Sequence, residues 1–117
     1  MEYLIFEGSL RMGDSKDATM VFAQDFEVSQ RATGERELLI ACEGVEILGR
    51  DEQLEAAAHP VHLDHTVVGR IRADDTRFKT LPVLGAGPHR VRIDVSPFHG
   101  HGFCDDFVLR RVVLKCA

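Results

Sequence analysis

The sequence has no tryptophan and only one tyrosine, Tyr3, among its 117 residues. Proteins that bind single-stranded nucleic acid stack its bases on aromatic side chains, and this chain supplies few of them. It also lacks a basic stripe, because the formal net charge is −5 and acidic residues flank the arginine pairs Arg90/Arg92 and Arg110/Arg111. A protein that binds nucleic-acid phosphates normally carries a basic patch. We therefore expect no nucleic-acid partner.

Long hydrophobic runs are also missing, since none approaches the roughly 20 apolar residues of a membrane span. The first residues, MEYLIFEGSL, place Glu2 and Glu7 around a short apolar run, whereas a signal peptide needs a basic start and a longer run. Cysteine is scarce too: Cys42, Cys104 and Cys116 are odd in number and form no C-x-x-C pair. These features predict a reduced, cytoplasmic protein without membrane attachment.

What the sequence does contain is alternation of apolar and polar residues, the pattern of strands with one buried face. It is clearest over His89–Val95, where Val91, Ile93 and Val95 share one parity, and it recurs over Met20–Val28 and Thr66–Arg72. Apolar runs predict further strands at Glu2–Phe6 and Phe107–Lys115. The runs Leu38–Cys42 and Val45–Leu48, separated by Glu43-Gly44, are either one bulged strand or two strands. Pro82 makes Phe78–Leu84 either an edge strand or a loop.

These patterns predict an all-β fold of about seven or eight short strands, a mostly antiparallel β-sandwich or a flattened barrel. The length suits a single domain, 1–117. At most one short helix is expected, at Asp51–Ala58, because His59-Pro60 would stop it. Edge strands make a homodimer one further expectation. The predicted core residues are Phe22, Phe26, Val67, Ile71, Val91, Ile93, Val95 and Val113.

Residues 98–106, FHGHGFCDD, concentrate potential metal ligands in one stretch. Two histidines at i and i+2 of an extended chain point to the same side, so His99 and His101 are the first candidate ligands. Cys104 or Asp105 would come next, and His62 would arrive from a second histidine group, H-P-V-H-L-D-H. This donor set favours zinc. The alternative is a polar loop with solvated histidines, in which no cofactor is bound.

The second histidine group does not converge on one point if V-H-L-D-H is a strand. In that case His62 and Asp64 face one way, whereas His59 and His65 face the other. A catalytic alternative uses Cys104 as a thiol nucleophile, with a histidine of the same loop as base and an aspartate as its orienter. No such geometry follows from nearness in sequence alone.

The leading functional hypothesis is a non-enzymatic binding or protein-interaction module, because the sequence has no recognisable catalytic constellation. An acidic chain suits a basic protein partner by electrostatic complementarity. The ending G-P-H-R-V-R-I-D-V, followed by a loop and a final apolar strand, resembles the closing hairpin of small bacterial β-sandwich proteins. This resemblance, to competence protein J and other inhibitors or immunity proteins, implies a role of that type. The alternative function is a metal-binding protein or a metal-dependent hydrolase.

Overall fold

The computed structural model describes residues 1–47, 58–96 and 106–117, and these residues form strands and no helix. The predicted all-β fold is confirmed. Within the described ranges, therefore, no helix is long and apolar enough to cross a membrane. The helix expected at Asp51–Ala58 lies, apart from Ala58, outside the described residues. The strands are β1 (Glu2–Met12), β2 (Val21–Val28), β3 (Arg36–Glu43), β4 (His59–Leu63), β5 (Thr66–Ile71), β6 (Asp75–Phe78), β7 (Gly87–Asp94) and β8 (Phe107–Cys116).

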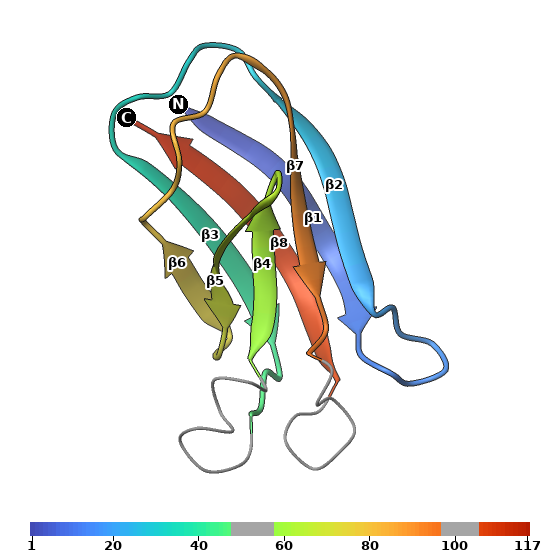
Figure 1. The fold of residues 1–117 in the computed structure, drawn as a ribbon. Coiled ribbons are helices and arrows are strands. Elements are labelled where there is room, and N and C mark those ends of the chain that lie inside the picture. The colour runs from blue at the N-terminus through green and yellow to red at the C-terminus, as the bar shows by residue number, and fades with distance from the viewer. Residues whose placement is uncertain (48–57, 97–105) are drawn as a thin grey trace.

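The strands form two antiparallel four-stranded sheets that pack face to face (Figure 1). Sheet A has the order β1-β8-β3-β6, and sheet B has the order β2-β7-β4-β5. The predicted β-sandwich is therefore confirmed. The edge strands are β1 and β6 in sheet A and β2 and β5 in sheet B, so the sandwich has two sides on which strand edges face solvent or each other.

The core follows from the alternation in the strands. In β7, Val91 and Ile93 are fully buried between the sheets, while Arg90 and Arg92 face outward. Strand β2 pairs with β7 without a register shift, so its alternation is preserved and Phe22 is buried. The predictions for Phe22, Ile71, Val91, Ile93 and Val95 are confirmed, and Phe26 packs partly buried against the same core.

Val67 is the one predicted core residue that is exposed, with 53% of its surface accessible. The cause is a register shift between β4 and β5: Val61 pairs with Gly69, but the next residue, His62, pairs with Val67. Val68 is thus an extra residue in β5, a β-bulge, and it packs against the core in place of Val67. Strict alternation assigned the wrong valine to the core.

Val113 is buried, as predicted, but not between the sheets. The pairing of β8 with β3 skips Arg110, so the inward-facing positions change from Leu109 to Val112 and Leu114. Val113 therefore lies on the outer face of sheet A, with only 5% of its surface exposed. A buried valine on an outer face means that its neighbours in the sheet cover it.

Candidate functional site

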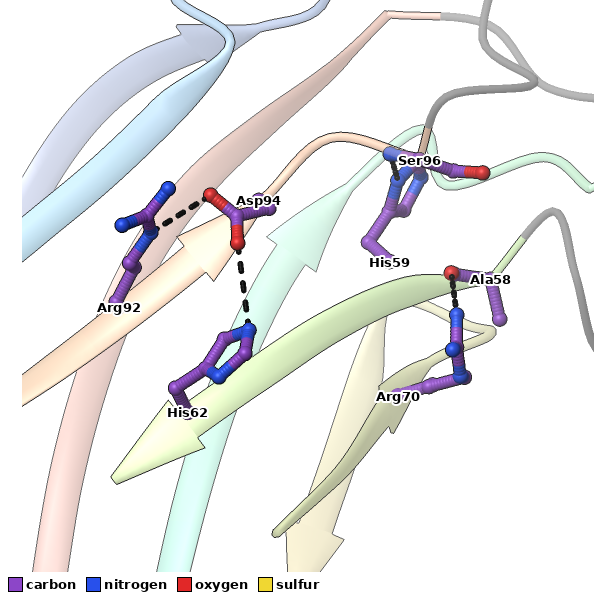
Figure 2. Close-up of polar contacts among 7 residues, drawn as sticks. All are labelled: Ala58, His59, His62, Arg70, Arg92, Asp94 and Ser96. Carbon is purple, nitrogen blue, oxygen red and sulfur yellow. Dashed lines mark hydrogen bonds and ion pairs between the residues drawn. The ribbon is translucent and has the colours of Figure 1, made fainter. Parts of the chain in front are cut away.

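His62, the one predicted metal ligand among the described residues, lies on the outer face of sheet B (Figure 2). Its Nε2 atom is 3.3 Å from Oδ2 of Asp94 on the neighbouring strand β7. The other carboxylate oxygen of Asp94 accepts a hydrogen bond of 2.9 Å from Nε of Arg92. The side chains of His62 and Asp94 are about a quarter exposed (27% and 23%). Asp94 thus joins a histidine and an arginine in one partly exposed cluster.

His59 lies on the opposite face of β4, as the alternation predicted, and is fully buried. Its Nδ1 atom accepts a hydrogen bond of 3.0 Å from the backbone N–H of Ser96 (Figure 2). The imidazole ring packs against Phe107, with ring centroids 4.6 Å apart. His59 therefore connects β4, the segment after β7, and β8 inside the core, and it does not join His62 in a common site.

The remaining predicted metal ligands, His99, His101, Cys104 and Asp105, lie outside the described residues. The zinc hypothesis for them stays a prediction, and so does the catalytic alternative that uses Cys104. Within residues 1–47, 58–96 and 106–117, no group of three or more His, Cys, Asp or Glu side chains is arranged to hold a metal ion.

A histidine contact that the sequence did not predict lies near the start of β7, whereas Ser96 follows the end of that strand. His89 of β7 places Nδ1 2.8 Å from Oδ2 of Asp64 and Nε2 2.6 Å from the carbonyl oxygen of Gly85. Both partners are acceptors, so the geometry suits the doubly protonated ring. Burial by itself lowers the pKa of His89, but the hydrogen bonds to Asp64 and Gly85 and the charge of Asp64 outweigh it and raise the pKa.

Two further ionisable side chains, those of Cys42 and Asp74, have structural roles. Cys42 is buried, and burial, followed by the negative charges of Asp74 and Asp75, raises the pKa of its thiol to about 12. A thiol of this kind is a poor nucleophile at neutral pH. Asp74 accepts a hydrogen bond of 2.8 Å from the backbone N–H of Val45. Aspartates beside turns commonly accept backbone hydrogen bonds, and Asp74 lies at such a position.

The outer face of sheet A carries an apolar row at its centre, formed by Leu4, Leu39 and Val113. Val113 pairs with Leu4 of β1 on one side and with Leu39 of β3 on the other, so the three side chains lie next to one another across the sheet. Their exposure rises from 5% at Val113 to 58% at Leu4. A concavity of about 310 Å³ lies over Leu39 and Val113. The pairing of three strands thus places an apolar row on this outer face.

Ion pairs flank the apolar row. On one side Nζ of Lys115 lies 3.9 Å from Oε1 of Glu2, and on the other Nε of Arg111 lies 3.5 Å from Oε2 of Glu7. All four side chains are more than half exposed, so water screens these pairs and they add little to stability. An apolar centre within a charged, solvated surround is the general anatomy of a protein interface.

Comparisons with known proteins identify no family. No family model matches the chain, and no curated protein matches it. Among solved structures, the chain is similar to the crystal structure of Podospora anserina GH26-CBM35 β-(1,4)-mannanase, with 14% sequence identity and a TM-score of 0.46. The match covers the whole of this chain but only 27% of the mannanase chain. A likeness at this level carries no argument about function.

Proposed function

We propose that the chain is a non-enzymatic protein-interaction module whose partner docks on the outer face of sheet A. The observation that supports this proposal is the apolar row of Leu4, Leu39 and Val113 with its flanking ion pairs. Covering the exposed part of Leu4 and the half-buried Leu39 with another protein would remove apolar surface from water. The rim charges would set orientation and encounter rate more than affinity.

The chemistry of the partner follows from charge. At a net charge of −5 the molecule attracts a protein with a basic surface over a range of about a Debye length, roughly 8 Å in physiological salt. An inhibitor or immunity-type protein acting on a basic target is one such module, and the reducing cytoplasm is its proposed compartment. A second copy of the chain is the competing occupant of the same face.

The test replaces one residue of the apolar row and one exposed valine elsewhere. Leu39→Glu places a charge at the centre of the outer face of sheet A, whereas Val83→Glu, at a position that is 49% exposed and lies outside the paired strands, serves as the matched control. Both variants should keep the wild-type circular dichroism spectrum. In quantitative capture from an extract of the native host, a specific partner should be lost with Leu39→Glu and retained with Val83→Glu.

Three outcomes would reject the proposal. Equal capture by all three proteins would show that the face is not used. A self-association seen by light scattering and abolished by Leu39→Glu would assign the face to a second copy. Empty captures combined with thermal stabilisation by a small molecule would favour a ligand-binding protein instead.

A further inference from the structure

One side of the sandwich is open between the edge strands of the two sheets. β5 is the last strand of sheet B and β6 is the last strand of sheet A, and they lie side by side (Figure 1). They approach closely where the ring of Phe78 covers Gly69. A groove of about 480 Å³ runs between the two strands, with Val67 and Val68 in its wall.

The groove is cationic although the chain is acidic. Arg70 and Arg72 line it from the β5 side, and Arg77 and Lys79 line it from the β6 side. None of the described residues that line it is acidic, whereas the whole chain has a net charge of −5. Nη1 of Arg70 donates a hydrogen bond of 3.1 Å to the carbonyl of Ala58 (Figure 2). Nη1 of Arg77 lies 3.4 Å from Oε1 of Glu37, an ion pair that offsets part of its charge. The described residues that line the groove still carry more positive than negative charge, which favours an anionic group there.

The backbone of β6 offers hydrogen-bonding groups along the same groove. The N–H of Cys42 donates to the carbonyl of Asp74 at 2.6 Å, which fixes the phase of the antiparallel ladder between β3 and β6. Because hydrogen-bonded and non-hydrogen-bonded pairs alternate along such a ladder, Thr76 and Phe78 direct their backbone groups toward β3. The N–H and C=O groups of Asp75 and Arg77 therefore point away from β3, toward the open edge.

We propose that the β5/β6 groove binds an extended acidic segment of another protein, which adds to sheet A as a strand beside β6. Backbone pairing with Asp75 and Arg77 would supply the alignment, as in other cases of strand addition, and the positive charge along the groove, with Lys79 in its wall, would select Asp and Glu side chains. β6 is the acceptor rather than β5, because the bulge at Val68 interrupts the edge of β5. This surface borders the apolar row, because Arg77 pairs with Leu39 and lines both concavities, so its test uses Lys79, which lines only the groove.

Two observations favour a peptide over a nucleic acid in this groove. β6 has only four residues, so a short segment fits it, whereas a long polyanion would extend over the acidic remainder of the molecule. In addition, among the described residues that line the groove, the one aromatic side chain is that of the buried Phe78, which is not available to stack a base.

The probe is a short synthetic peptide in which Glu alternates with Val and Thr, and its control is the same peptide with Gln in place of Glu. We expect the acidic peptide to bind, the Gln peptide not to bind, and added salt to weaken the complex. Hydrogen exchange followed by NMR should show new protection of the Asp75 and Arg77 amides in the complex. Lys79→Glu should weaken binding about tenfold, because it replaces attraction by repulsion. Lys16→Glu, the same charge change outside the groove, should alter binding by less than about twofold.

Each other result would overturn the proposal. Binding without protection of Asp75 and Arg77, matched by heparin or single-stranded DNA, would describe a simple polyanion site. Equal losses with Lys79→Glu and Lys16→Glu would describe non-specific charge attraction. Concentration-dependent protection of the same amides without any peptide would assign the edge to a second copy of the chain, and absence of peptide binding would remove the site.

Discussion

Gly69 of β5 lies directly beneath the ring of Phe78 of β6, so a Cβ atom at position 69 would be 2.4 Å from Cε1 and 2.5 Å from Cδ1 of that ring. The contact joins the edge strands of the two sheets at the open side of the sandwich. Phe78 is 7% exposed because it reaches across to this glycine. The closeness of the sheets at this point therefore depends on the missing side chain.

Gly69→Ala should destabilise the fold by about 1–3 kcal/mol, the usual cost of overpacking, since a buried aromatic ring has to move. The measurement is urea unfolding, with the midpoint compared at unchanged slope. Gly85→Ala is the control, because a Cβ there meets nothing within 4 Å, and it should be neutral or slightly stabilising. Replacing Phe78 by Leu in the Gly69→Ala background should recover part of the loss; if the two losses simply add, the ring is not the cause.

The sandwich could be predicted because alternation is intact in the strands that carry most of the core. β7 and β2 pair over eight residues with no register shift, and their sequences show the pattern directly. β5 and β8 could be predicted as strands, but which of their residues face the core could not. The bulges at Val68 and Arg110, which change this, depend on pairing with β4 and β3. A bulge has no signature in the alternation of one strand alone.

β4 shows a second limit. Its sequence HPVHL contains a proline, which ordinarily argues against a strand inside a sheet. In the fold, β4 pairs with β7 only from Val61 to Leu63, so Pro60 lies beyond that ladder and pairs only with β5. The sequence could predict that His59 and His62 face opposite ways, but it could not supply Asp94 or Ser96 as their partners, because these come from the pairing of distant strands.

The apolar row was not predictable for the same reason. Leu4, Leu39 and Val113 are far apart in the sequence and meet only through the register of three strands. The groove was not predictable either. It is lined by Arg70, Arg72, Arg77 and Lys79, which are close in sequence, but only the fold shows that β5 and β6 are edge strands of different sheets and border one groove.

The bulge in β5 makes a direct prediction about two hydrophobic residues that alternation treats alike. Ile93→Ala should cost about 2–5 kcal/mol, because Ile93 is fully buried and the truncation leaves a cavity. Val67→Ala should change stability by less than about 0.5 kcal/mol, because Val67 is exposed. Chemical unfolding of both variants measures the difference. A loss above about 1 kcal/mol for Val67→Ala would contradict the bulge.

Cys42 should resist thiol reagents in the folded protein. A pKa of about 12 instead of 9.0 reduces the thiolate population near neutral pH about a thousandfold, and the side chain is only 5% exposed. The measurement is labelling with Ellman's reagent in a Cys104→Ser/Cys116→Ser background, so that only Cys42 reports. Labelling should be slow in buffer and fast in denaturant. Rapid labelling in buffer at unchanged stability would show that Cys42 is accessible.

The His89–Asp64 contact should make stability depend on pH near neutrality. The pKa of His89 is raised above its ordinary value of 6.5, because hydrogen bonds to Asp64 and Gly85 outweigh burial, so the folded state holds the proton more tightly than the unfolded state. The stabilisation is therefore complete below the unfolded-state pKa and is lost as the pH rises through the higher pKa of the folded state. NMR titration of the His89 ring measures the direction of the shift directly.

Asp64→Asn separates this charge effect from the turn that Asp64 forms. Asp64 has a φ of 56°, a conformation that Asn also tolerates, and an amide oxygen can still accept the backbone N–H of Arg90. At about pH 5.5 the variant should be less stable than wild type by about 1 kcal/mol, a modest figure because Asp64 is 40% exposed and water screens the pair. The difference in stability between the two proteins should shrink as the pH rises, because a neutral His89 ring is stabilised less by a negatively charged partner. His65→Gln, at the adjacent exposed histidine, should leave the pH profile unchanged. A wild-type profile retained by Asp64→Asn would mean that the protonated His89 is not stabilised by this carboxylate.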